Sequence, residues 1–392
     1  MSEATGTNLG LGKLFAPAAL AAIVTLIVCG GSFLGDQVGF LQSYLIGYTF
    51  FLNLALGFLG LTLLHHLVRG AWGISVLRIF EAGSSPGVFL ALLVLIVPIL
   101  VGAPGIYPWA DPAQVQGDLV LEFRAPYMNI VAVSIRTVIY FALWAWMAHF
   151  MRKSSLRQDE SKDANETQKR TNWSAGLLIV YMLSVTLATT DWIMTIEPHW
   201  FSTIFGAWFV VGGALTAIAL ATAIVMQNAA NEPYRDVVKP GLVKDLGNMC
   251  FVFTLLWAYT SFSQFVIIWS GNLPEFITYY VSRTKPGWNV IGSFLMIGQF
   301  LIPFVVLLSP RVKTLPKTLA TVAILIFAVR FVDVFYMIAP FFRTTGLSVD
   351  WRDFVSLIFV GSIWLALFVS QLTKASLLPQ HDNRLVEAYE HA

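Results

Sequence analysis

The sequence predicts an all-α integral membrane protein with ten transmembrane helices. Three observations point to this fold class: the composition, the number of long apolar runs and the distribution of Lys and Arg. Of the 392 residues, 57% are hydrophobic and only 12% are charged, whereas a soluble domain carries about 25% charged residues. Lipid must therefore be the solvent for much of the surface. We expect a single polytopic membrane domain over residues 1–392, with no separate soluble catalytic domain.

Ten apolar runs are long enough to cross a bilayer. A spanning helix needs roughly 20 mostly apolar residues, and a backbone in lipid must satisfy its own hydrogen bonds. The third run is the weakest, because Pro98 and Pro104 interrupt it. The runs lie near residues 14–34, 44–67, 88–106, 129–151, 173–191, 201–226, 247–270, 288–309, 318–341 and 354–373.

The first run is interpreted as a retained helix. A signal peptide is the alternative, but only Lys13 precedes the run and no small-x-small cleavage pattern follows it. Cys29 and Cys250 stand alone in apolar runs, which favours small buried side chains over metal or haem attachment. The six histidines include none at depths suited to a pair of haem ligands, and His65, His66 and His149 are expected to meet lipid headgroups.

The Lys and Arg residues predict the orientation. Ten spans place both termini and the even-to-odd connections on one face, and 17 of the 24 Lys and Arg residues fall there. Five lie on the other face, and Arg136 and Arg330 lie inside spans. By the positive-inside rule, we expect both termini in the cytoplasm. A net charge of +2 without a basic stripe argues against nucleic acid as a partner.

Two polar segments are expected on the cytoplasmic side. The most polar stretch, residues 152–172, is interpreted as a flexible loop, and residues 374–392 as a short tail. Tryptophans near the span ends are expected to act as interfacial anchors. They are Trp109, Trp192, Trp200, Trp269, Trp288 and Trp351.

Charged residues inside spans indicate candidate functional positions, because burial in lipid is costly without partners. Arg330 and Asp333 are three residues apart in the ninth span and can pair, and Tyr336 continues the same face. Such a pair either fixes packing or belongs to a proton or ion path. Arg136 in the fourth span needs a counter-charge from another helix, and we favour Asp191 for that role.

Polar side chains also mark the seventh span and the connection between the fifth and sixth. Tyr259, Ser263 and Gln264 could carry protons with water, although local bonds to helix carbonyls are the commoner role for hydroxyls. The connection holds Glu197 and His199 close to Asp191. These three form either a titratable cluster at the membrane surface or a short interfacial helix with solvated charges.

Two stretches resemble a known family. DWIMTIEPHWFSTIFG, from Asp191 to Gly206, and LWAYTSFSQFVIIWSGNLPE, from Leu256 to Glu275, are similar to motifs of ActF. This is the second large membrane subunit of alternative complex III, a bacterial quinol:cytochrome c oxidoreductase, and it belongs to the NrfD-like polysulfide-reductase membrane subunits. The two motifs together cover 36 residues, in order and on the expected spans.

The resemblance implies two four-helix bundles, spans 2–5 and 6–9, with spans 1 and 10 peripheral. It implies a bacterial inner-membrane subunit without a redox centre, inactive alone, with roles in proton translocation and assembly and a possible quinone site. The implied partners are an NrfD-like sister subunit, an iron–sulfur protein and multihaem cytochrome c subunits. A proton-coupled secondary transporter and a purely structural scaffold remain the alternatives.

Overall fold

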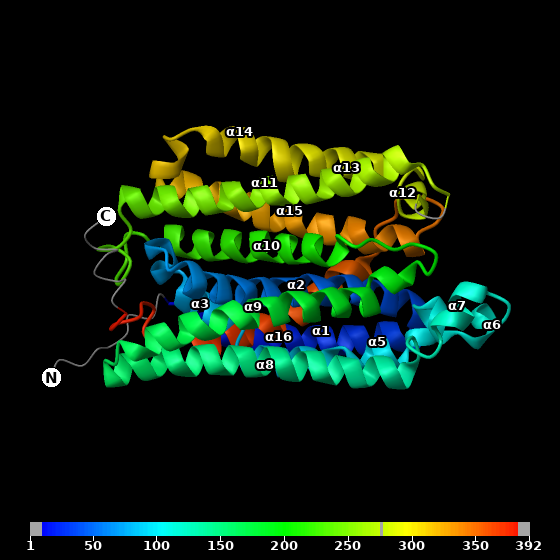
Figure 1. Ribbon diagram of the computed structural model, residues 1–392, viewed down its shortest axis with the longest axis horizontal. Helices are drawn as coiled ribbons and strands as arrows, with labels where there is room; N and C mark the ends of the chain where they lie inside the picture. The colour runs from blue at the N-terminus through cyan, green and yellow to red at the C-terminus, as the bar shows by residue number, and fades with distance from the viewer. Residues whose placement is uncertain (1–9, 275–276, 383–392) are drawn as a thin grey trace.

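The computed structural model describes residues 10–274 and 277–382. All regular structure in these two ranges is helical. Ten helical segments are long and apolar enough to cross a membrane, and they lie side by side in an elongated bundle (Figure 1). The predicted fold class, an all-α polytopic membrane protein with ten transmembrane helices, is confirmed.

Eight spans are continuous helices and two are composite. The third consists of α3 (Leu77–Gly83), α4 (Pro86–Leu95) and α5 (Val97–Val101), and the eighth of α13 (Trp288–Leu295), a π-helical segment (Met296–Leu301) and α14 (Ile302–Leu308). The continuous spans are α1 (Phe15–Gly35), α2 (Gln37–Val68), α8 (Ile130–Ser161), α9 (Asn165–Trp192), α10 (Phe205–Gln227), α11 (Pro240–Gly271), α15 (Pro316–Phe342) and α16 (Trp351–Leu372).

The two ends of the bundle differ. Helix α1 begins and α16 ends at the left of Figure 1, which we call the basic end because the connections there carry most of the Lys and Arg. Short helices lie at the opposite end: α6 (Pro112–Val115), α7 (Leu119–Arg124) and α12 (Thr278–Ser282). Helices α6 and α7 project beyond the spans.

The third span lies closer to the N-terminus than predicted. It covers Leu77–Val101 instead of 88–106, and the residues after Gly102 form short 3₁₀ turns. The sequence was misleading here because Arg78 and Glu81 resemble loop residues. In the structure these two side chains pair with each other at 2.7 Å, which lets the polar turn be buried.

The predicted flexible loop at 152–172 is wrong, since most of it is helix. Helix α8 continues to Ser161 and α9 begins at Asn165, so the turn between them holds only residues 162–164. The polar side chains of this hairpin bond across its interface. Ser154 Oγ donates to Glu166 Oε2 over 2.5 Å, and Gln158 Nε2 donates to Thr167 Oγ1 over 2.8 Å. High polarity here reflects helix pairing outside the apolar spans.

The described part of the tail packs against this hairpin. Leu377 and Leu378 are buried, and Gln380 N donates to Asp159 Oδ1 over 2.9 Å. The remaining tail, 383–392, lies outside the described residues. Residues 377–382 are therefore docked on the α8–α9 hairpin.

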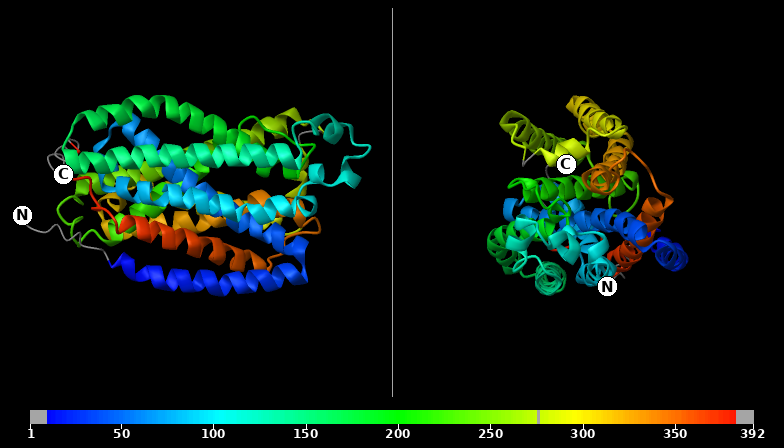
Figure 2. Two further views of the ribbon diagram at one scale, coloured as in Figure 1. Left: turned by 90° about the horizontal axis from the view of Figure 1, so that it is seen from below. Right: turned by 90° about the vertical axis from the view of Figure 1, so that its right-hand side faces the viewer.

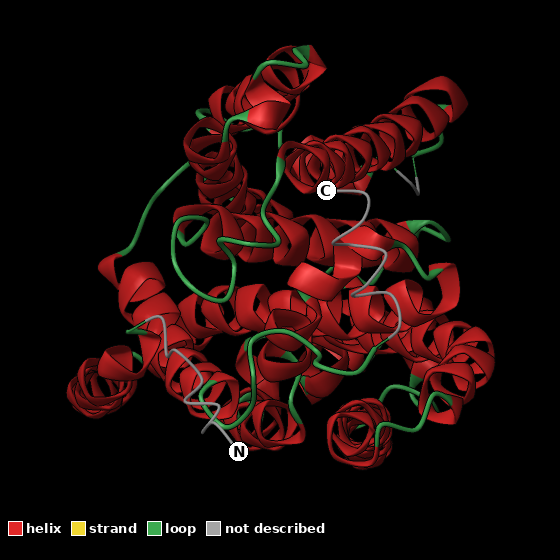
Figure 3. Cartoon of the chain, turned by 90° about the vertical axis from the view of Figure 1, so that its left-hand side faces the viewer, coloured by secondary structure: helices red, strands yellow, loops and turns green. Residues whose placement is uncertain are grey.

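Helices α2 and α10 pack against each other and are the most deeply buried spans (Figure 2). Helix α2 also contacts α9, α15 and α16, while α10 contacts α9, α11 and α15. Helix α1 packs mainly on α16 and is largely exposed, whereas α16 buries Val360 and Trp364. Figure 3, viewed from the basic end, shows that helices joined by loops make up the described part of the chain. The division into two four-helix bundles stays a prediction.

The predicted tryptophan anchors are only partly correct. Trp269 and Trp351 are exposed, as interfacial anchors would be. The other four are buried in the protein: Trp109, Trp192, Trp200 and Trp288. Two of them use their indole N–H groups inside the fold, because Trp109 donates to Thr195 Oγ1 and Trp192 donates to Thr137 Oγ1.

Candidate functional site: polar clusters within the spans

Five polar side chains from four spans meet halfway along their helices. We call this set the central polar cluster: Asn53, Thr216, Trp257, Arg330 and Asp333. Thr216 lies at the midpoint of α10, and Arg330 lies 14 residues after the start and 12 before the end of α15. The cluster therefore lies near the middle of any bilayer that these helices cross.

Arg330 and Asp333 form the centre of this cluster. Their side chains are 1% and 3% exposed, and Arg330 Nη1 donates to Asp333 Oδ2. Trp257 Nε1 on α11 donates to the same carboxylate oxygen over 3.2 Å. The predicted pairing within the ninth span is confirmed. One carboxylate oxygen therefore accepts from two donors on different spans.

Helices α10 and α2 complete the environment of Arg330. Its Nε donates to Thr216 Oγ1 over 3.2 Å, and Nη2 lies 3.5 Å from Asn53 Oδ1. Asn53 Nδ2 in turn donates to Phe209 O over 2.8 Å. Gly212 lies directly against the guanidinium, so a side chain there would displace it. The cluster thus joins spans 2, 6, 7 and 9.

A second cation lies beyond Asp333 toward the opposite end. Arg283 is buried and donates to Tyr336 O over 3.0 Å and to Met337 O over 2.7 Å. Tyr336 O lacks its usual helical donor because Pro340 has no N–H. Burial lowers the pKa of Arg283. Tyr336 itself is half-buried on the same face as Asp333, as predicted.

The candidates on α11 have different environments. Gln264 is buried and accepts a hydrogen bond from Ser202 Oγ, in the connection between the fifth and sixth spans. Ser263 is half-buried. Tyr259, the third residue suggested to carry protons, does not lie in the interior with them, because its side chain is 68% exposed. Residues 259 and 264 lie on different faces of the helix, which composition alone does not show.

Arg136 and Asp191 form a second ion pair nearer the opposite end, in which Arg136 is 18% exposed and Asp191 is buried. Arg136 Nε donates to Asp191 Oδ2 over 2.7 Å and Nη2 to Oδ1 over 3.2 Å, a bidentate arrangement. Tyr140 also donates to Oδ2, over 3.2 Å. Asp191 is fully buried, and the Arg136 guanidinium lies 3.8 Å from the Tyr127 ring centre. The predicted partnership of these two residues is confirmed.

Glu197 and His199 do not join Asp191 in one cluster. Asp191 points into the bundle toward Arg136, whereas His199 Nε2 lies 3.0 Å from Asp118 Oδ2 in the connection before α7. Burial raises the pKa of Glu197, and the His199 backbone N–H and the charge of His199 oppose that shift. Backbone N–H groups and His199 lower the pKa of Asp118. Asp191 therefore lies inside the bundle, whereas Glu197 and His199 lie in a separate environment near Asp118.

Gln299 is a polar residue that was not among the candidates predicted from the sequence. Its side chain is fully buried in the π-helical part of the eighth span, and neither amide atom has a hydrogen-bond partner among the described residues. π-Helical turns often occur at functional sites. Pro303 explains the local geometry, because it cannot donate to the carbonyl four residues earlier. In the sequence, the one indication of this site was a single amide side chain within an apolar run.

The predicted headgroup contacts of His65 and His66 are wrong, since both rings are completely buried at the basic end of α2. They pack beside one another with ring centres 5.4 Å apart, and His65 also packs on Trp72. His149 is exposed. Cys29 and Cys250 are buried, as predicted.

A cavity of about 810 Å³ between α10 and α15 is large enough to hold a quinone headgroup. Its lining is mostly apolar, and Lys317 is the one titratable side chain among the lining residues. Quinol oxidation requires groups that accept protons, and this lining offers no carboxylate or imidazole. The cavity therefore does not fit a quinol-oxidising site.

Comparison with known protein families and with curated protein sequences gives no match.

Proposed function

We propose that this chain is a membrane subunit of a bacterial quinol-oxidising electron-transfer complex, without a redox centre of its own, and that its central polar cluster serves proton movement. The observation that carries the proposal is the Arg330–Asp333 pair, buried at mid-depth with partners from three other spans. A buried ion pair is a costly way to gain stability. At mid-depth, Asp333 could accept a proton from one side of the membrane and release it toward the other side.

The polar residues on either side of the cluster support such a path. Toward the opposite end lie Tyr336 and the Gln264–Ser202 bond. Toward the basic end, Cys250 Sγ donates to Thr222 Oγ1 over 3.6 Å, and Thr254 lies one turn further along α11. Water molecules would have to bridge the gaps, because proton transfer needs groups within hydrogen-bond reach.

The family resemblance supplies the biological setting. The stretches Asp191–Gly206 and Leu256–Glu275 resemble ActF of alternative complex III. On that basis the partners are an NrfD-like sister subunit, an iron–sulfur protein and multihaem cytochrome c subunits. The bias of 17 basic residues to one face supports cytoplasmic termini in a bacterial inner membrane. Quinone binding to this chain rests on the resemblance alone.

The test replaces Asp333 by Asn in the purified complex and measures protons released per electron in liposomes. We expect the ratio to fall while electron transfer continues, because the amide cannot take up and release a proton as the carboxyl does. Asp353→Asn is the matched control, since Asp353 also pairs with an arginine, at 2.6 Å, but lies at the start of α16. An unchanged ratio in Asp333→Asn would refute the proton path.

One observation favours a secondary transporter as the second candidate. The third and eighth spans are both interrupted, and they occupy the same position in each five-span half. Interruptions at corresponding positions are typical of transporter binding sites. Substrate uptake by liposomes containing this chain alone would support that function. Co-purification with multihaem cytochromes and an iron–sulfur subunit would instead support the electron-transfer complex.

A further inference from the structure

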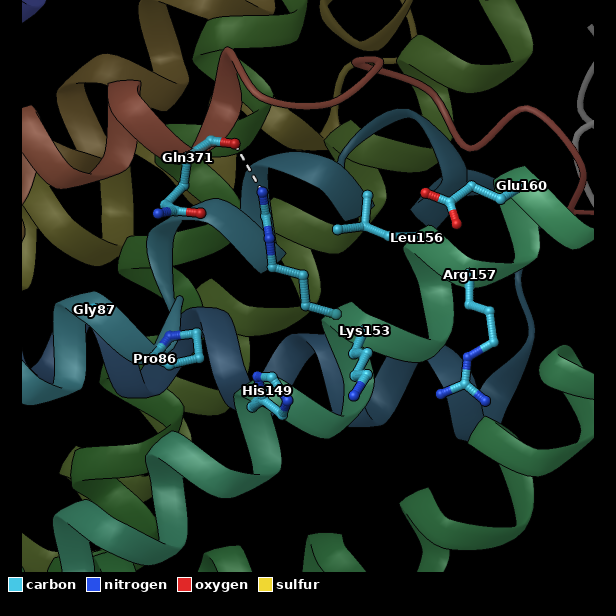
Figure 4. Close-up of a pocket in the computed structure, with 9 residues that line it drawn as sticks. Pro86, Gly87, His149, Lys153, Leu156, Arg157, Glu160 and Gln371 are labelled. Atoms are coloured by element: carbon cyan, nitrogen blue, oxygen red, sulfur yellow. Dashed lines mark hydrogen bonds between the residues drawn. The ribbon is translucent and has the colours of Figure 1, made fainter.

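A cavity of about 540 Å³ opens at the basic end between α4, α8 and α16 (Figure 4). It is separate from both polar clusters described above. Its volume is within the range of about 300–1,000 Å³ typical of ligand sites. The side chains around it that carry or can carry charge all come from α8: His149, Arg152, Lys153, Arg157 and Glu160.

The charge of this cavity is predominantly positive. The lining contains three cations, Arg152, Lys153 and Arg157, and one carboxylate, Glu160. Arg157 is partly neutralised, because its Nη1 donates to Glu166 Oε1 over 3.2 Å. Lys153 is exposed and has no carboxylate within ion-pair distance in the part of the chain that the structure describes. The cavity therefore presents a net positive charge to an incoming ligand.

Arg152 gives the strongest indication of a ligand. Arg152 is only 8% exposed, and its Nη2 donates to Gln371 O over 2.7 Å. Among the described residues no carboxylate lies within ion-pair distance of this guanidinium. Buried charges are normally paired. Glu81 attracts this cation from beyond ion-pair distance, and Arg78 opposes that attraction. A buried cation that borders an open cavity without a carboxylate in direct contact suits an anionic ligand.

The N-terminus of α4 adds a further feature. Gly87 lies in the first turn of this ten-residue helix and lines the cavity. Pro86 has no N–H, and the N–H groups of Val88 and Phe89 donate to Ser85 O. Gly87 N–H is therefore the one backbone donor of this turn without an acceptor among the described residues, and the helix dipole favours anions there. A Cβ atom on Gly87 would meet no atom within 4 Å, so the space above it is open. A phosphate could approach the backbone at this point.

The cavity lies at the depth expected for lipid headgroups. Trp146 on α8 and Trp173 on α9 are both about half exposed and pack edge to face, with ring centres 6.3 Å apart. Exposed tryptophans mark the membrane interface. His149 and Lys153 follow Trp146 by three and seven residues toward the basic end, which is about one and two helical turns.

Exposed apolar side chains continue from the cavity toward the opposite end. On α4 and α5 they follow Gly87 at spacings of three and four residues, which keeps them on one helix face. They are Leu90, Val94, Val97 and Val101. Helix α8, which packs beside α4, exposes Ile135, Val138 and Ile139. A soluble anion would make no contact with these apolar surfaces, whereas the acyl chains of a lipid would lie along them.

We propose that this cavity binds an anionic phospholipid, with the phosphate held by Arg152, Lys153 and the N-terminus of α4, and the acyl chains along α4, α5 and α8. Basic pockets between spanning helices at the cytoplasmic face are a known means of binding acidic headgroups. The proposal does not depend on the function proposed above. It requires only that the chain spans a membrane.

The experiment measures lipid binding to the full-length purified chain by native mass spectrometry, with thermal stability as the second readout. The probes are short-chain phosphatidylglycerol, short-chain phosphatidylcholine and inorganic phosphate. We expect only phosphatidylglycerol to bind and to raise the melting temperature. Lys153→Gln should weaken phosphatidylglycerol binding about fivefold, from roughly 1 kcal/mol per basic residue near the surface. Arg152→Gln should weaken it at least as much.

Lys244→Gln is the matched control, because Lys244 is an exposed lysine of the basic end on α11, away from the cavity. The Lys244→Gln variant should bind phosphatidylglycerol with the same affinity as the unmodified chain. Since Lys153 is exposed, its substitution tests the site even where Arg152→Gln does not fold. Equal losses for Lys153→Gln and Lys244→Gln would overturn the site. Equal stabilisation by inorganic phosphate or by phosphatidylcholine would overturn the anionic lipid as its ligand.

Discussion

Asp191 shows how one carboxylate in an apolar helix is compensated. Its two oxygens accept from Arg136 and Tyr140, and each of these donors comes from α8. The pairing was predicted from depth alone, because both residues lie in the half of their spans farther from the basic end. The bidentate geometry and the tyrosine could not be predicted, since they depend on how α8 and α9 are rotated.

At the residue scale we therefore expect Asp191→Ala to destabilise the protein by about 1.5–3 kcal/mol, because the charged hydrogen bonds of the pair are lost while Arg136, which is 18% exposed, keeps its bond to Tyr127 O. The measurement is the free energy of unfolding in mixed micelles. The double variant Arg136→Met/Asp191→Ala should recover much of the loss, since no unpaired charge remains. If the double variant loses the sum of the two single effects, the pair does not act as a unit.

At the scale of elements, Pro340 and Arg283 act together on one backbone carbonyl, that of Tyr336. The proline removes the donor for Tyr336 O near the end of α15, and Arg283 supplies a replacement from the connection between the seventh and eighth spans. Arg283 is one of the five basic residues that the charge pattern predicts on the less basic face. That this arginine folds back over a proline-containing helix is not visible in the sequence, because the contact spans 53 residues.

This arrangement predicts a coupling between the two residues. Arg283→Met should cost about 1.5–3 kcal/mol, because a hydrogen bond from a charged donor is lost. In a Pro340→Ala background the cost should be smaller, since the backbone N–H of the introduced alanine can donate to Tyr336 O. Thermal unfolding of the two single variants and the double variant gives the comparison. Identical costs of Arg283→Met in both backgrounds would contradict the arrangement.

At the scale of the whole molecule, the closest approach of α2 and α10 depends on two glycines. A Cβ on Gly57 would collide with the backbone carbonyl of Gly213, and one on Gly213 would crowd Asn53. Small residues allow such approaches between membrane helices. The contact also sets the position of Asn53 beside Arg330, so the central polar cluster depends on it.

Gly57→Ala should accordingly destabilise the protein by about 1–3 kcal/mol through overpacking. The control is Gly176→Ala on α9, where a Cβ would meet no atom within 4 Å. That change should be neutral or stabilising, by up to about 1 kcal/mol, because alanine favours helix. Melting temperatures of both variants in detergent test the difference. A Gly57→Ala protein as stable as the control would show that the helices can separate freely.

Composition, run length and the cost of charge in lipid were enough to predict the fold class, the approximate positions of nine spans and the ion pairs of Arg136 and Arg330. These are properties that can be read along the chain without knowing how its helices pack. The same reasoning misplaced the third span and took the α8–α9 hairpin for a loop, because polar residues that bond to each other resemble residues that bond to water.

Which face of each helix is buried depends on tertiary packing. That packing turned Tyr259 outward, separated His199 from Asp191, and produced the buried Gln299 and the ligand-sized cavity beside Arg152. When every helix face is apolar, hydrophobicity no longer distinguishes the interior from the lipid-facing surface. Rotation is then set by close packing and by polar partners on other helices, which no single segment of the sequence contains.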